Sequence, residues 1–452
     1  MTGPARQAVS PVTNRPVALW SPFGLYYGWI IVASALIINT TGSVMSILTF
    51  SFLIVPMGHD MGWSRGEMSL ALTFRLLTAA VISPYLGSII DRIGTRWPGA
   101  AAGLIAGVSL ISVGFVDNLW MLYLVFAISG FAGFGGPAAA LLTNVPVAKW
   151  FVVNRGRAMA VATFGAPVGV FVSIYIARWA IEIAGWRQAW MLFGMLILAT
   201  VVPASALLMR RVPEDHGLRP DGAVAPPPAP NVGSKSGASV EASQAARADV
   251  SWTRVETFRH PAAWLILSYS LVTSFALSGT VVHRVSFWQD IGISSSMVVL
   301  GTAADPFTVI FSAVFFGMLA ERVPIRYLGL VGGLGFGASM LPMIFTTGQT
   351  VSVFLHAITW GFFAGAFIAT SNLVWANYFG RKSVGSIQGV VLPVSVTVNA
   401  LSAPAYGYML DAGIAPSLIW TASLCFFTLG GVLIFLAHPP RAESATLPAA
   451  AG

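Results

Sequence analysis

Two charged residues lie deep within long apolar stretches, and they are the strongest candidates for chemistry in this chain. Arg75 lies eight positions past Glu67 in the stretch 67–90, and Asp305 lies eight positions past Met297 in the stretch 297–319. Arginine is permanently charged, and its planar fork of donors matches a carboxylate. A buried carboxyl group can exchange a proton. The two residue types together therefore fit the binding of an organic anion with a proton.

The composition shows what kind of chain holds these charges. Of 452 residues, 56% are hydrophobic and only 9% are charged, whereas soluble proteins carry about 25% charged residues. This excludes a soluble globular protein. The single cysteine, Cys425, excludes an intrachain disulfide and a Cys-based metal site. Since no Walker loop, metal-ligand cluster or nucleophile elbow occurs, we expect no cofactor and no enzyme activity.

Apolar stretches long enough to cross the roughly 30 Å of a bilayer's hydrocarbon core repeat along the chain. We expect twelve membrane-spanning helices, which makes the fold class an all-α membrane protein. The first 26 residues lack the pattern of a cleaved signal peptide. The twelve expected spans are 27–50, 67–90, 97–115, 119–148, 157–180, 187–209, 260–282, 297–319, 325–345, 351–377, 384–409 and 415–437.

The basic residues predict the orientation of these spans. With both termini in the cytoplasm, nineteen of the 24 Lys and Arg residues fall on the cytoplasmic side, as the positive-inside rule requires. Arg65, Arg178, Arg187 and Arg284 then lie on the outer side, and Arg75 lies within a span. This bias explains the net charge of +8 without nucleic acid as a partner.

A polar segment divides the spans into two sets of six. It contains three consecutive prolines at 226–228 and a Gly/Ser/Ala-rich run at 233–243, a composition that cannot form a core. We therefore expect a tail at 1–26, a first half at 27–210, a flexible cytoplasmic linker at 211–259, a second half at 260–437 and a tail at 438–452.

The two halves contain related motifs. Gly87, Asp91, Arg92 and Arg96 follow the second span, and a similar loop from Gly317 through Glu321, Arg322 and Arg326 follows the eighth, 230 residues later. Trp150-Phe151 and Tyr378-Phe379 repeat at an offset of 228 residues. At the offset of 230, Arg75 and Asp305 occupy equivalent positions. They can share a polar cavity or form a purely structural ion pair.

These motifs resemble those of a known family. The loop Gly87-x-x-x-Asp91-Arg92-x-Gly94-x-Arg96 is similar to the signature loop of the major facilitator superfamily. Three further segments resemble its monocarboxylate-transporter branch: Tyr27-Gly28-Trp29, the stretch from Trp150 to Gly169, and Pro213 to Pro220, the last as in bacterial members. The resemblance implies two pseudo-symmetric six-helix halves, alternating access and a monomer in the bacterial inner membrane. It also implies a small organic anion and a proton as partners besides the lipid bilayer.

The resemblance also implies roles for particular residues. The loop residues Gly87, Asp91, Arg92, Arg96, Glu321 and Arg322 form a conformational latch that stabilises the outward-facing state; the alternative is that the arginines only set topology. A substrate contact is expected at Arg75, where a structural ion pair with Asp305 is the competing interpretation. Further contacts are expected at Asn39, Thr40, Trp360 and Asn372, where interhelical hydrogen bonding is the alternative. Asp305 is the expected proton-coupling site, with His283 and His356 as secondary candidates.

One position departs from the family pattern. Family members commonly carry a substrate-binding arginine in the eighth span, where this chain has Ala313. Arg75 can supply the missing cation from the other half. The departure also leaves open an exporter or antiporter of another small molecule. A non-transporting receptor on the same scaffold is a further alternative, although such receptors usually carry a larger cytoplasmic extension.

Overall fold

The computed structural model describes residues 26–134, 137–151, 154–216, 218, 220–222, 252–320, 322–380 and 384–440, and these residues are helical apart from short connections. The first half contains α1 (Gly28–Gly42), the 3-10 turn η1 (Ser43–Met45), α2 (Ile47–Met61), α3 (Arg65–Ile93), α4 (Arg96–Val113), α5 (Leu119–Gly130), α6 (Pro137–Trp150), α7 (Arg155–Ala184), α8 (Trp186–Pro203) and the π-helical turn η2 (Ala204–Leu208). Two 3-10 turns follow, η3 (Glu214–His216) and η4 (Pro220–Gly222). The second half contains α10 (Arg254–Arg259), α11 (Pro261–Asp290), α12 (Ser295–Thr302), α13 (Ala304–Leu319), α14 (Ile325–Ser339), α15 (Leu341–Ile344), α16 (Thr350–Phe379), α17 (Val384–Asp411) and α18 (Pro416–Leu436).

Eleven helices or helix pairs among the described residues are long and apolar enough to cross a membrane. The expected span 119–148 is the exception, because it divides into α5 and α6. Gly133 between them has a φ of +72°, a conformation that favours glycine, and Pro137 begins the second helix. Together with this broken pair, the eleven spans found among the described residues correspond to the twelve expected ones.

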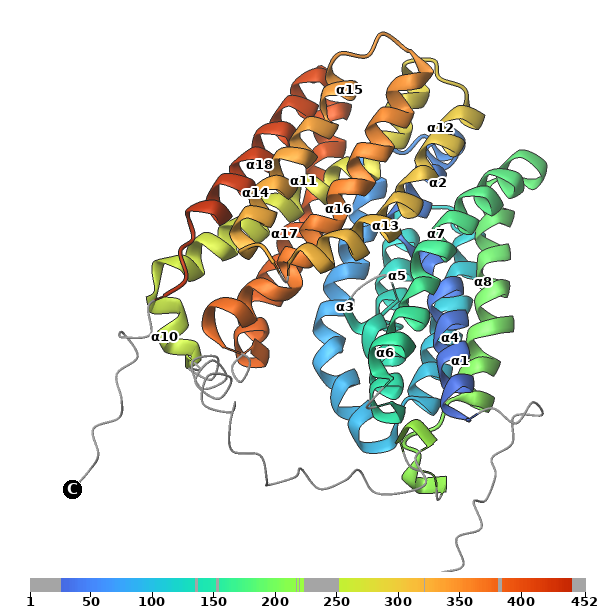
Figure 1. Cartoon of the computed structure of the whole chain (residues 1–452). Coiled ribbons are helices and arrows are strands. Elements are labelled where there is room, and N and C mark those ends of the chain that lie inside the picture. The colour runs from blue at the N-terminus through green and yellow to red at the C-terminus, as the bar shows by residue number, and fades with distance from the viewer. Residues whose placement is uncertain are drawn as a thin grey trace, which may run out of the picture.

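The two halves form separate bundles that approach each other at one end only (Figure 1). We call the end where α10 lies the linker end, and the end where α11 and α17 finish, at Asp290 and Asp411, the far end. Toward the far end, Ser51 donates to the carbonyl of Val281 at 2.8 Å and Thr73 donates to that of Ala400 at 2.5 Å. In the view of Figure 1 the ribbons of the two halves diverge toward the linker end.

Close helix packing within each half depends on small residues. A Cβ on Gly169 of α7 would lie 2.0 Å from the carbonyl oxygen of Thr40 in α1. Similarly, a Cβ on Gly333 of α14 would lie 2.5 Å from the Cα of Gly431 in α18. Such contacts let two backbones approach in lipid, where the hydrophobic effect does not drive helices together.

The expected linker is partly ordered where the structure describes it. Residues 223–251 lie outside the described residues. At 252–259, however, Trp252 is buried and α10 forms with a capping box between Thr253 and Glu256. The backbone N–H of Thr253 donates to Glu256, which lowers the pKa of that carboxyl below its usual value. The second half therefore begins about eight residues earlier than 260.

Candidate functional site: buried charges within the spans

Arg75 lies in the interior of α3, as expected, and its side chain is only 2% exposed. Its Nη1 donates to the carbonyl oxygen of Met45 at 2.6 Å. Met45 ends η1, the break between α1 and α2, where carbonyls without helical partners carry a partial negative charge. The Nε and Nη2 groups of Arg75 have no partner among the described residues. Two donor groups of a buried cation thus lack a hydrogen-bond partner in this state.

Asp305 is buried as well, but its partner is Arg284 and not Arg75. Nη2 of Arg284 forms an ion pair with Oδ2 of Asp305, and both side chains are nearly inaccessible to solvent. The sequence-based placement of Arg284 on the outer side is therefore wrong. Helix α11 continues to Asp290, eight residues beyond the expected end of its span, so Arg284 lies inside the helix.

The guanidinium of Arg284 is held from three sides within the second half. Besides Asp305 in α13, Nε2 of His356 in α16 lies 3.3 Å from Nη1 of Arg284. The ring centroid of Trp360 lies 5.2 Å from its central carbon, a cation–π distance. His356 Nδ1 lies 2.7 Å from the carbonyl oxygen of Ser339 and must donate to it, so Nε2 of a neutral ring accepts from Arg284. His356 and Trp360 therefore position Arg284.

Each residue of the ion pair has one polar atom without a hydrogen-bond partner in the part of the chain that the structure describes. Oδ1 of Asp305 and Nε of Arg284 are buried and have no hydrogen-bond partner among the described residues. A proton on the Asp305 carboxyl removes the negative charge of this pair and leaves the buried Arg284 without its counter-charge.

The polar residues of the first span serve mainly to pack helices in this state. Asn39 Nδ2 donates to the carbonyl of Ala162 in α7 at 2.8 Å. Thr40 donates to Leu36 in its own helix, and its backbone lies against Gly169. The Asn39 hydrogen bond joins two helices, whereas the Thr40 hydrogen bond stays within α1. Asn372 in α16 is exposed, so its side chain does not join the Arg284 cluster.

Where the structure describes them, the expected latch residues at the linker end are exposed, have open space or bond within their own half. Gly87 has open space, because a Cβ there would meet only Leu141 Cδ1, at 3.8 Å. Arg96 Nε donates to the carbonyl of Ala206 within its own half at 2.7 Å. Arg92 and Arg322 are exposed, while the side chain of Asp91 and residue Glu321 lie outside the described residues.

His283, a secondary candidate, bridges the two halves. Its Nε2 lies 2.8 Å from the carbonyl oxygen of Ala403 in α17 and 3.4 Å from Oγ of Ser69 in α3. The shorter contact requires that Nε2 donate to Ala403. The ring is fully buried. His283 is therefore part of the contact between halves and is separate from the Arg284 cluster.

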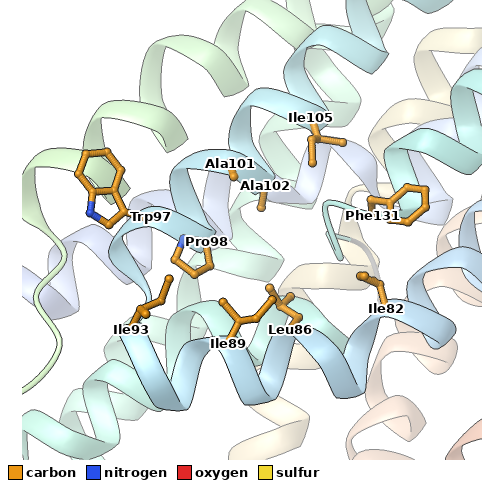
Figure 2. Close-up of a pocket in the computed structure, with 10 residues that line it drawn as sticks. All are labelled: Ile82, Leu86, Ile89, Ile93, Trp97, Pro98, Ala101, Ala102, Ile105 and Phe131. Atoms are coloured by element: carbon orange, nitrogen blue, oxygen red, sulfur yellow. The ribbon is translucent and has the colours of Figure 1, made fainter.

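A hollow of about 390 Å³ between α3 and α4 is chemically unsuited to an anion (Figure 2). Figure 2 shows that all ten lining side chains are apolar, among them Ile82, Leu86, Trp97 and Phe131. Such a surface excludes charge. The buried charges, and not this hollow, are therefore the candidate site.

Buried charges inside a bundle of two six-helix sets are typical of membrane transport proteins. The family model described as Major Facilitator Superfamily matches residues 32–395, and the chain belongs to this family. It is a multi-pass integral membrane protein and not an enzyme.

The chain is similar to curated members of the family at low identity. It is 24% identical over 424 residues to Monocarboxylate transporter 12-B of Danio rerio, covering 90% of this chain and 85% of that protein. It is 25% identical over 419 residues to Monocarboxylate transporter 12 of Mus musculus, covering 87% and 82%. A shorter match, 22% over 165 residues, covers 36% of this chain and 40% of the uncharacterized MFS-type transporter YcxA of Bacillus subtilis.

Solved structures confirm the fold. The nucleoside transporter NupG aligns with a TM-score of 0.67 at 13% identity, covering 91% of this chain and 98% of that one. A bacterial homolog of the human lysosomal transporter Spinster, in an inward-facing and unoccupied conformation, aligns with a TM-score of 0.65 at 14% identity, covering 91% and 97%.

Proposed function

We propose that this protein is a secondary transporter that moves a small organic monoanion, of the monocarboxylate class, together with a proton by alternating access. The observation that carries the proposal is Arg75, a buried arginine within a span that keeps Nε and Nη2 unpartnered. A cation at the centre of a span costs about 2.5–3.5 kcal/mol on insertion scales. A charged residue at this position usually faces the bundle interior and marks a substrate or ion pathway.

The charge balance of the interior supports a monoanion. Among the described residues, the buried side chains that are formally charged are Arg75, Arg284 and Asp305. Because Asp305 compensates Arg284, one positive charge is left, at Arg75. A single carboxylate neutralises it in the low-dielectric interior. The names of the relatives that cover most of the chain, which are monocarboxylate transporters, point to the same substrate class.

Asp305 is the proposed proton site of this cycle. Protonation of its carboxyl neutralises the acidic partner of Arg284 and leaves that arginine, like Arg75, able to attract the substrate anion. Proton and anion then bind cooperatively, and cooperative binding is the thermodynamic basis of symport. Arg284 thus takes the place of the cation that is missing at Ala313, from α11 instead of α13.

The linker end is proposed to face the cytoplasm of a bacterial cell, with both termini on that side, because of the bias in basic residues. The contacts between halves near the far end then make this the inward-facing state, in agreement with the open space at Gly87. The protein is proposed to act as a monomer, since the buried charges of each chain form its own complete site.

Uptake by proteoliposomes tests the proposal. Purified protein is reconstituted and offered radiolabelled monocarboxylates, with and without an inwardly directed proton gradient. Accumulation of one anion that requires the proton gradient supports the proposal. Exchange or efflux that ignores the proton gradient favours the exporter or antiporter alternative. Specific binding without any flux favours the receptor.

A further inference from the structure

The far end of the closed interface contains a helix cap that one half supplies to the other. Helix α3 begins with a capping box, in which Ser64 and Glu67 satisfy each other's backbone N–H groups. The N–H groups of Arg65 and Gly66 remain, and both donate to the carboxylate of Asp411, at 3.3 and 2.8 Å. Asp411 is the last residue of α17 in the second half.

Two further contacts reinforce this cap. Nη2 of Arg65 forms an ion pair with Asp290 at the end of α11, at 2.7 Å. A Cβ on Gly407 would lie 2.6 Å from the Cα of Gly66, so α3 and α17 are in backbone contact here. An acidic group at a helix N-terminus interacts favourably with its N–H groups and its dipole. The cap thus stabilises the closed far end.

The same two helices have a matching set of residues at the linker end. Helices α3 and α17 run antiparallel, with Gly66 opposite Gly407 and Asp411. Gly87 lies 21 positions after Gly66, so this register brings it opposite residues 386–390, and Gly389 lies in that range.

Gly87 and Gly389 are not in contact with each other in this state. A Cβ on Gly389 would meet nothing within 4 Å, and one on Gly87 only a single methyl group. The glycine pair at the far end is therefore closed, and the equivalent pair at the linker end is open. Small residues at the open pair leave room for a close approach that this state does not use.

We propose that the Asp411 cap is a latch of the far end, which forms while that end is closed and is released when the halves rock and the linker end closes. Gly87 of the expected linker-end latch then approaches Gly389. The inference rests on the proposed alternating access but not on the identity of the substrate.

The other side of the interface lacks such a cap. Glu182 in α7 lies 229 residues before Asp411, within the offset of the repeat. Its carboxylate pairs with Arg178 in the same helix at 2.7 Å, and α12, the helix equivalent in the repeat to the start of α3, has no side-chain cap. Glu182 is therefore a matched control for Asp411.

Cysteine labelling tests the release of the Asp411 cap without any substrate. The native Cys425 is replaced by Ser, and Ser69→Cys places a reporter behind the far end, where Ser69 is fully buried beside His283. The reaction of purified protein with a maleimide then reports opening of the far end. Total reactivity is measured after denaturation, and folding by size-exclusion chromatography.

The proposal predicts that Asp411→Ala raises the labelling rate of the reporter about fivefold, the factor for a loss of about 1 kcal/mol. Asp411→Asn should give a smaller rise, and Glu182→Ala should give none. Adding Gly389→Val to Asp411→Ala should reverse the rise, because the linker end can no longer close. An unchanged rate in Asp411→Ala would overturn the Asp411 latch alone. A reporter that is unreactive in every folded variant would overturn alternating access as well.

Discussion

Arg75 contributes a cation whose hydrogen-bonding capacity is mostly unused in this state. One of its donors is bound to the carbonyl of Met45, and its Nε and Nη2 are buried without a partner. A buried polar group without a partner costs about 1–3 kcal/mol, and more when it is charged. A bound carboxylate removes this cost through the bidentate geometry that arginine favours.

Replacing Arg75 should therefore abolish substrate binding without preventing folding. We expect Arg75→Ala to weaken binding at least thirtyfold, equivalent to about 2 kcal/mol, and Arg75→Lys to restore little, because lysine offers a point charge. Thermal stabilisation by the substrate measures the affinity. Arg178→Ala, at an exposed arginine on α7, is the control. Near-normal affinity in Arg75→Ala would end the anion-site hypothesis.

Asp305 has two roles that a pair of variants can separate. Asp305→Asn leaves Arg284 buried without its counter-charge, so we expect a loss of about 3–5 kcal/mol of stability. The double variant Arg284→Gln with Asp305→Asn should recover most of that loss in thermal unfolding.

Transport by Asp305→Asn protein that still folds then distinguishes a coupling site from a structural ion pair. If Asp305 is the coupling site, this variant exchanges substrate but does not accumulate it in response to a proton gradient. Accumulation with unchanged pH dependence would show that the pair is structural, and His283 would become the next candidate.

The sequence locates Arg75 and Asp305 within their spans but does not locate Arg284. The depths of Arg75 and Asp305 were predictable from the charges they place inside apolar stretches. The charge of Arg284 suggests the end of a span at that point, although Val285, Phe287 and Trp288 continue the apolar pattern. The pairing of Asp305 with Arg284 depends on how α11 packs on α13, which no single stretch of sequence contains.

At the scale of elements, some glycines are in close contact with a neighbouring helix, and others have open space in this state. Gly169 is in contact with the backbone of Thr40, while Gly87 and Gly389 have open space. The apolar pattern predicts the helices around all of these residues. It does not tell which glycine is in contact in a given state, because that depends on the arrangement of the two halves.

Substitutions at Gly87 and Gly169 should differ in their effects on stability and on turnover. Gly87→Val should leave the thermal stability within about 0.5 kcal/mol of the parent, since it meets only Leu141 here. It should slow turnover more than it weakens binding. Gly169→Ala should destabilise the protein by about 1–3 kcal/mol through overpacking against α1. A large loss of affinity with an unchanged maximal rate in Gly87→Val would contradict the latch interpretation.

Breaks within spans are the elements that the hydrophobic pattern locates least well. The first span continues past its expected end at 50 to Met61, through η1 and α2. Polar residues occur at 39–43 and at Ser46, but hydropathy alone does not tell a break from polar side chains within one continuous helix. The break nevertheless matters, because it presents the carbonyl of Met45 to Arg75.

At the scale of the whole molecule, two bundles in contact near one end enclose separate charge sites. The first half contributes Arg75 and the second half contributes the Arg284–Asp305 pair. The internal repeat predicts two equivalent halves, and the structure has them. The relative position of the halves was not predictable, since both states of a transporter are built from one sequence and differ only slightly in free energy.

The central claim is that a proton gradient drives a small organic anion through this protein by way of Arg75. The most direct test is uptake of a monocarboxylate by proteoliposomes under an inwardly directed proton gradient, for the parent and for Arg75→Ala. The account predicts that the parent accumulates the anion, that a protonophore abolishes the accumulation, and that Arg75→Ala shows neither accumulation nor exchange. Accumulation by Arg75→Ala at the parental rate, or its persistence in the parent after the proton gradient is collapsed, would contradict it.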